Sequence, residues 1–219
     1  MMSERLKPFV FVLFVTLIVL TCFAYPIRAQ YGATNGEWRS YGGDLGSTKY
    51  SPLDQIDATN FADLKIAWRW NSVDGSVNLD SLREQRPQTS IRGLQATPLM
   101  VNGVLYLSTA MYQAAAIDAS TGETLWIHDP EVYLGGAPTH GYGSRGVAYW
   151  TDGKEERIFW GTSEGYLLAV DAKTGQPPSN FGKNGRVDLT DGIPRADRGE
   201  TNYQGRNLLG VKSPPIIVR

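Results

Sequence analysis

Cysteine is almost absent from this chain of 219 residues, and the only one, Cys22, lies within an apolar N-terminal stretch. The rest of the chain therefore has no disulfide, no thiolate metal site and no Cys-x-x-Cys-His haem attachment. The chain also has no large excess of positive or negative charge, because its 21 basic residues are nearly balanced by 22 acidic residues. Since no basic stripe alternates with aromatic residues either, we expect no nucleic-acid partner.

Glycine and aromatic residues are plentiful. The chain has 24 Gly, 12 Pro, 6 Trp and 11 Tyr, which is typical of a turn-rich β protein rather than a helical one. Its length allows one large all-β domain or two ordinary domains.

The first 29 residues are predicted to be a signal peptide. Arg5 and Lys7 precede a continuous apolar run from Phe9 to Ala24, which is slightly short for a full membrane span. An uncleaved anchor and a lipidated Cys22 are the two alternatives. All three predict export, so we expect a periplasmic or secreted protein, either free or anchored to a membrane through this segment.

One stretch occurs twice, since residues 116–123 (Ala-Ile-Asp-Ala-Ser-Thr-Gly-Glu) recur with substitutions at 169–176, 53 residues later. A period near 50 predicts repeated supersecondary units. In each copy a short strand ends at an Asp, whose carboxylate can accept N–H bonds across a turn that Thr-Gly completes. Trp126 follows the first copy, and we expect its ring to pack against a neighbouring unit.

The strand pattern around these copies is that of propeller blades. Asn102-Gly103 lies between two apolar runs and predicts a hairpin, which with the hairpin after it makes about four strands, the size of one blade. Residues 147–170 repeat this pattern, but Pro177 and Phe181 stand where the Trp strand would follow.

Three further segments have clear patterns. Residues 64–70 alternate apolar and polar and predict a half-buried strand, whereas residues 71–92 predict an exposed loop. Residues 213–219 resemble the first strand of a third blade with nothing to pair with. We therefore expect residues 30–219 to be an incomplete all-β propeller of about two and a half blades, the N-terminal portion of a longer protein.

Arg145 is the candidate for chemistry, because an Arg followed by Gly at the start of a strand can direct its guanidinium at a carboxylate. A surface arginine in a loop is the alternative. A resemblance favours a role in chemistry. The succession of four stretches resembles the pyrroloquinoline-quinone (PQQ)-dependent dehydrogenases, and within that family the glucose dehydrogenase-like branch. These stretches are residues 95–99, 116–126, 144–150 and 181–189. The resemblance implies an eight-bladed β-propeller that holds PQQ and calcium near its axis. It also implies oxidation of an alcohol or aldose in the periplasm, with a quinone or cytochrome c as electron acceptor.

The resemblance also assigns residues to the cofactor. Arg145 falls on the Arg that pairs with a cofactor carboxylate, Gln95 on a residue at the cofactor rim, and Ser213 near a cofactor-contacting Thr. Thr139 and His140 stand where the alcohol and methanol branches have a vicinal cysteine pair. This departure favours the glucose branch, in which His140 is expected to bind the cofactor near Arg145. The family's calcium ligands and catalytic Asp are expected downstream, so we expect no catalytic or metal-binding residue within this chain and no activity from it alone.

Two other functions remain open. A non-catalytic scaffold, such as an outer-membrane assembly factor, would share the repeat but would need neither Arg145 nor Gln95. A carbohydrate-binding propeller would rest only on exposed Trp and Tyr residues.

Overall fold

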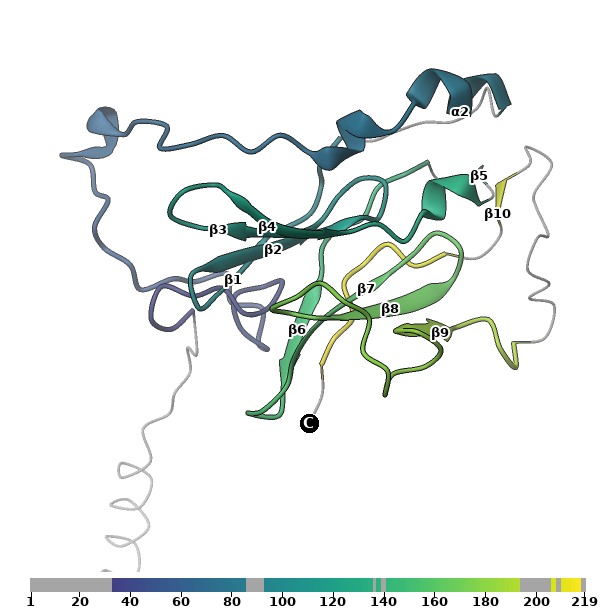
Figure 1. Cartoon of the computed structure of the whole chain (residues 1–219). Coiled ribbons are helices and arrows are strands. Elements are labelled where there is room, and N and C mark those ends of the chain that lie inside the picture. The colour runs from purple at the N-terminus through teal and green to yellow at the C-terminus, as the bar shows by residue number, and fades with distance from the viewer. Residues whose placement is uncertain are drawn as a thin grey trace, which may run out of the picture. The chain divides into compact units, whose positions relative to one another are not determined.

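The computed structural model describes residues 33–85, 93–135, 137–138, 141–193, 206–207 and 210–217, all within the compact unit Gly32–Arg219. Two four-stranded antiparallel sheets dominate these residues, and in each the strands follow one another in chain order (Figure 1). No helix within them is both long and apolar enough to cross a membrane. The first sheet comprises β1 (Leu99–Val101), β2 (Val104–Ser108), β3 (Ala114–Asp118) and β4 (Thr124–His128), and the second comprises β6 (Ala148–Thr151), β7 (Glu156–Gly161), β8 (Tyr166–Asp171) and β9 (Arg186–Asp188).

The hairpin between β1 and β2 forms at the predicted turn. Asn102 and Gly103 both have positive φ, 51° and 79°, and Val101 pairs with Val104 across the turn. This geometry is that of a two-residue turn whose twist matches the strands, which explains why Asn-Gly occurs here.

The two copies of the repeat form equivalent turns. The carboxylate of Asp118 accepts the backbone N–H groups two and three positions ahead, both at 2.9 Å. The carboxylate of Asp171 accepts the corresponding groups at 3.0 and 2.8 Å. The glycines that close these turns, Gly122 and Gly175, have φ of +76° and +70°. The sequence repeat is therefore a structural repeat.

Trp126 joins the first sheet to the second. Its indole N–H donates to the backbone oxygen of Ala172 at 2.9 Å, and its ring covers Gly175 so closely that a Cβ there would lie 2.7 Å from it. The adjacent β4 residue on the same face, His128, packs edge-to-face on buried Trp160, with ring centroids 5.7 Å apart. The prediction that Trp126 packs against a neighbouring unit is confirmed.

Trp68 repeats this contact one unit earlier. Its indole N–H donates to the backbone oxygen of Ala119 at 3.1 Å, and its ring covers Gly122. The strand predicted over residues 64–70 is nevertheless wrong, because the segment forms no ladder with any described residue, and Leu64 and Ile66 are 53% and 66% exposed. The indole, rather than the backbone, attaches this segment to the first sheet.

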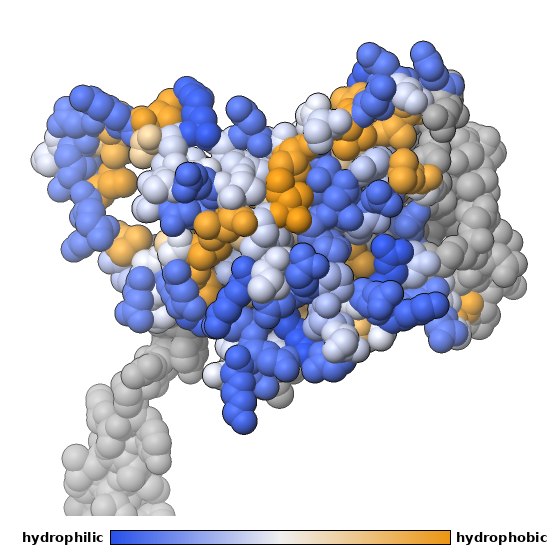
Figure 2. Space-filling view, in the orientation of Figure 1, coloured by the Kyte–Doolittle hydropathy of each residue, from blue (hydrophilic) through white to orange (hydrophobic). Residues whose placement is uncertain are grey.

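The main core lies between the two sheets. Each sheet contributes alternate side chains to it, and Trp160, the largest of them, is fully buried. On β4 the opposite face carries Leu125 and Ile127, which are exposed. Figure 2 shows such apolar side chains interrupting a largely polar surface. The buried core residues are Leu99, Val101, Tyr106, Ala114, Ala116, Val147, Ile158, Trp160, Leu168, Val170 and Ala172.

The exposed loop predicted over residues 71–92 is wrong for most of residues 73–85, which are helical. It contains a 3-10 helix η2 (Val73–Ser76) and the helix α2 (Leu79–Gln85), and a further 3-10 helix η1 (Phe61–Asp63) precedes them. The side chain of Asn78 accepts the N–H of Ser81 at 3.0 Å at the start of α2, and Leu82 is buried. A single buried apolar residue gives too weak a periodicity to predict this helix. Residues 86–92 lie outside the described residues.

The outer edge of the second sheet is altered as predicted. β9 supplies the fourth strand, and Gly185 occupies the position that matches Trp126 in the first sheet. Phe181 fills space on that side by packing edge-to-face on Phe159, with ring centroids 5.2 Å apart. The second sheet therefore presents no indole at this position.

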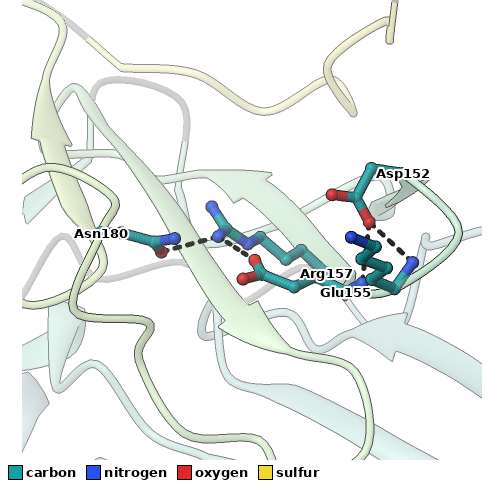
Figure 3. A network of polar contacts seen from close by, with 5 residues as sticks. Asp152, Glu155, Arg157 and Asn180 are labelled. Atoms are coloured by element: carbon teal, nitrogen blue, oxygen red, sulfur yellow. Dashed lines mark hydrogen bonds and ion pairs between the residues drawn. The ribbon is translucent and has the colours of Figure 1, made fainter.

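A polar network attaches the loop after β8 to the β6–β7 hairpin (Figure 3). The guanidinium of Arg157, nearly buried on β7, donates to Asn180 at 2.6 Å, pairs with Glu155 and lies 5.3 Å from the centre of the Trp150 ring. In the turn beside it, the carboxylate of Asp152 accepts two backbone N–H groups at 2.8 Å. This network compensates the burial of the arginine charge.

Residues 213–219 were predicted to be a strand with nothing to pair with. Their described part, residues 213–217, is not assigned as a strand, so the prediction of a strand there is wrong. Directly before it, Val211 N–H donates to the backbone oxygen of Thr162, and the oxygen of Lys212 accepts from Arg145 N–H, so the chain leading into this stretch is attached to the second sheet. Before it lie η3 (Val132–Leu134) and a parallel pair of short strands, β5 (Ala137–Pro138) and β10 (Arg206–Asn207).

Candidate functional site

Three chain segments lie side by side where β1 and β6, the first strands of the two sheets, begin. Thr97, before β1, donates its N–H to the oxygen of Arg145 at 3.2 Å. Arg145, before β6, donates its own N–H to the oxygen of Lys212 at 2.9 Å. These bonds bring the segments that carry Gln95, Arg145 and Ser213 to the same end of the sheets.

Gly146 permits this close approach. It forms a parallel bridge with Thr97, has φ of +142°, and a Cβ built on it would lie 3.3 Å from the Thr97 oxygen. A larger residue would be strained in this backbone region. The glycine thus fixes the path of the chain directly after Arg145.

Arg145 and Ser213 line one pocket of about 340 Å³. Most of the remaining wall is apolar or aromatic, so a flat, partly apolar molecule with an anionic group fits its chemistry, and its volume lies in the range of ordinary ligand sites. The principal wall residues are Tyr41, Leu45, Val147, Tyr149, Pro214 and Ile216.

The two arginines of this pocket differ in their partners. The guanidinium of Arg39 pairs with Glu37, lies 3.4 Å from the side-chain oxygen of Asn102 and sits 5.5 Å from the centre of the Tyr149 ring. Its hydrogen bond lowers the pKa of the Glu37 carboxyl, so this pair is ionised. The exposed side chain of Arg145 forms no hydrogen bond or ion pair with any residue that the structure describes. Arg145 is therefore the arginine available to an anionic ligand.

The structure does not place the other two predicted site residues, Gln95 and His140, in the pocket. Gln95 is exposed, two residues before Thr97, and does not line the pocket. His140 and the neighbouring Thr139 lie outside the described residues. Among the residues that are described, no group of three or more His, Cys, Asp or Glu side chains could hold a metal ion.

Two polar contacts between distant segments were not predicted from the sequence. The hydroxyl groups of Ser108 and Ser144 lie 2.6 Å apart, and the carboxylate of Asp74 accepts the hydroxyl of Thr109 at 2.6 Å and the N–H of Met111 at 3.3 Å. Each contact joins residues more than 30 positions apart, so no local sequence pattern predicts it.

Comparison with known proteins identifies the fold. A family model described as "PQQ: Glucose/ethanol/alcohol dehydrogenase, beta-propeller domain" matches residues 38–219. The chain belongs to this family. Its two consecutive four-stranded sheets, joined through Trp126, confirm the expected all-β propeller of the quinoprotein type, of which the chain contains part.

Individual relatives are dehydrogenases of this family. The chain is 38% identical to the dehydrogenase subunit of alcohol dehydrogenase (quinone) from Gluconobacter oxydans strain 621H, with 77% of this chain and 21% of the relative covered. It is 31% identical to the quinoprotein glucose dehydrogenase of the same strain, with 83% and 22% covered. The crystal structure of quinohemoprotein alcohol dehydrogenase from Comamonas testosteroni superposes with a TM-score of 0.52 at 31% identity, covering 74% of this chain and 20% of that one. The chain thus spans about a fifth of the length of the curated relatives it matches.

Proposed function

We propose that residues 30–219 form the N-terminal part of a periplasmic PQQ-dependent dehydrogenase that oxidises an alcohol or an aldose, and that residues 1–29 are its signal peptide. Membership of the quinoprotein family supports the reaction class. The observation that carries the proposal is the exposed guanidinium of Arg145, without a counterion among the described residues, in the wall of an apolar pocket.

The residues of the pocket fit the cofactor. PQQ brings three carboxylates, and burying them without a cationic partner would be costly. The planar guanidinium of Arg145 can hold one carboxylate through two hydrogen bonds, which a lysine would not reproduce. Ser213 adds a hydroxyl at the same wall, and the aromatic and aliphatic side chains suit a flat ring system.

When bound, PQQ would supply a two-electron acceptor for oxidation of the substrate, and calcium would supply a Lewis acid beside it. This chain's own residues have other tasks. Arg145 would bind and orient an anionic group, Ser213 would offer a hydroxyl beside it, and the apolar wall would exclude water. Gln95, which does not line this pocket, would contact the rim of the cofactor from the neighbouring segment. We propose that the catalytic base and the calcium ligands come from other parts of the protein, so that this chain by itself is inactive.

The substrate class is supported from two sides. The higher identity to an alcohol dehydrogenase supports an alcohol. The sequence Thr139-His140, in place of a vicinal cysteine pair, supports an aldose and the glucose dehydrogenase-like branch. Turnover of the full-length protein with a primary alcohol and with glucose, using either a quinone or cytochrome c as acceptor, would distinguish them.

The proposal is tested by removing the guanidinium. In the full-length protein, Arg145→Ala should weaken binding of PQQ, titrated with calcium into the apo-protein, by about 2–5 kcal/mol, the usual cost of removing one member of a buried charge pair. Arg69→Ala, which removes an exposed guanidinium elsewhere, is the matched control and should bind as the wild type does. Equal affinity of wild type and Arg145→Ala would overturn the proposal and favour a non-catalytic propeller scaffold.

A further inference from the structure

Two serine hydroxyls are buried beside the candidate site. Ser108, the last residue of β2, is 0% exposed, and Ser144, directly before Arg145, is 1% exposed. Their Oγ atoms lie 2.6 Å apart, a short hydrogen bond in which either can donate. The pair connects the first sheet to the chain segment that leads into the second.

A second contact holds the same segment. The hydroxyl of Tyr112, a fully buried side chain of the β2–β3 loop, donates to the oxygen of Gly143 at 3.5 Å. Burial raises the pKa of this hydroxyl, so it keeps its proton and remains a donor at neutral pH. Residues 143 and 144 are thus attached to the first sheet at two successive positions.

The next residue, Arg145, is constrained by its neighbours. Both of its backbone groups are engaged, with Thr97 and with Lys212, while its side chain is exposed toward the pocket. Ser144 is buried and Arg145, the next residue, is exposed, so anchoring the first side chain restricts the direction of the second. A slip of this segment would carry the guanidinium away from its ligand.

We propose that the hydrogen bond between Ser108 and Ser144 is the element that positions Arg145 for recognition of a ligand carboxylate. The inference rests on the proposed function. Ser108 and Ser144 are positioning residues in this account, because neither lines the pocket. The pair acts on the direction of the Arg145 side chain more than on the stability of the fold. A buried hydrogen bond between two hydroxyls contributes little net free energy to folding, because both hydroxyls lose their bonds to water, but it fixes the distance and angle between two chain segments.

The test is a double-mutant cycle in the full-length protein, with the dissociation constant of PQQ in the presence of calcium as the readout. Ser108→Ala leaves Ser144 without its partner and should weaken PQQ binding about tenfold, because a misplaced guanidinium loses its two-point contact. In the Arg145→Ala background the same change should have no further effect. Ser108→Cys nearly keeps the size of the side chain, but its thiol is a weak hydrogen-bond donor, so it should lose an intermediate amount of PQQ affinity. This variant also provides the test if Ser108→Ala does not fold.

The control separates positioning from stability. Ile117→Val removes one methylene from a buried β3 residue of the same sheet, so it should lower the melting temperature without changing PQQ affinity. If Ser108→Ala or Ser108→Cys behaves like Ile117→Val, the positioning role is overturned while the proposed function stands. An equal loss of affinity in both Arg145 backgrounds would also overturn it. No effect of Arg145→Ala itself would instead reject the proposed function.

Discussion

The indole N–H of Trp126 donates to the backbone oxygen of Ala172, 46 positions further along the chain, at 2.9 Å. Trp68 makes the same contact with Ala119, 51 positions further on, at 3.1 Å. In both cases the ring also covers the glycine of the following Asp-x-x-Thr-Gly turn. One kind of contact therefore joins consecutive units, and it accounts for the most regular feature of the sequence.

Removing this indole should destabilise the protein. Trp126 is half-buried, so Trp126→Ala should cost about 2–4 kcal/mol of unfolding free energy, somewhat less than for a fully buried ring. Trp126→Phe keeps a ring over Gly175 but loses the hydrogen bond, and should cost about 1–2 kcal/mol. Denaturant unfolding of the full-length protein measures both, and a loss below about 1 kcal/mol for the alanine variant would contradict the docking role.

The glycine beneath the ring should be equally sensitive. Gly175→Ala places a Cβ 2.7 Å from the Trp126 ring at φ of +70°, whereas Gly153→Ala places one at φ of +92° with nothing within 4 Å. Both variants carry the strain of a left-handed backbone, about 1–2 kcal/mol, but only the first also displaces an indole. Melting temperatures should therefore fall clearly further for Gly175→Ala, and equal shifts would show that the ring moves away freely.

The parts of the fold that sequence reasoning found are those specified locally. Asn102-Gly103 determines its turn through the φ values that these two residues tolerate, and Asp118 determines its own through bonds to N–H groups two and three positions ahead. Arg145 was found because a glycine follows it and because the surrounding segment resembles a known family. The turn signals and the glycine after Arg145 lie within a few residues of the features they predict, whereas the resemblance rests on the succession of four stretches along the chain.

The contact between His128 and the second sheet should make stability depend on pH. Burial against Trp160 lowers the pKa of His128, and the charge of Arg186 lowers it further, while the bond to the Gly175 oxygen and the charge of Asp129 oppose this shift. The unfolded state therefore takes up the proton more readily. Stability should decrease as pH falls below the ordinary histidine value of about 6.5 toward the lowered pKa of the folded state.

His128→Phe provides the comparison for this pH effect, because it keeps a ring against Trp160 but cannot titrate. Unfolding free energies between roughly pH 7 and pH 5 should fall less steeply for this variant than for the wild type. Parallel curves would mean that the histidine is not responsible.

Asp74 should control the local stability of η2 and α2. Its carboxylate holds the hydroxyl of Thr109 and the N–H of Met111, so Asp74→Ala should speed proteolytic cleavage within residues 73–85 about tenfold. Asp80→Ala, which removes an exposed carboxylate of α2 that lies 3.7 Å from Arg83, is the control. Cleavage rates followed by mass spectrometry check this, and equal rates for the two variants would contradict the anchoring role.

What sequence reasoning missed depends on contacts between distant segments. Leu64 and Ile66 alternate with polar residues as a strand requires, yet a strand forms only where a neighbour offers its backbone, and no described residue does so. The bond between Ser108 and Ser144 spans 36 positions and leaves no pattern in either segment. His140 remains a prediction, because it lies outside the described residues.

The short span of the Trp126 contact has a consequence for how the protein folds. Because each sheet is built in chain order and each indole contacts a turn about fifty residues ahead, every docking step closes a loop of similar, moderate length. Assembly can then advance one unit at a time as the chain emerges, without waiting for distant segments. Gly185, at the matching position of the second sheet, offers no indole for such a step, so the docking contact is specific to the units that carry Trp68 and Trp126 among the described residues.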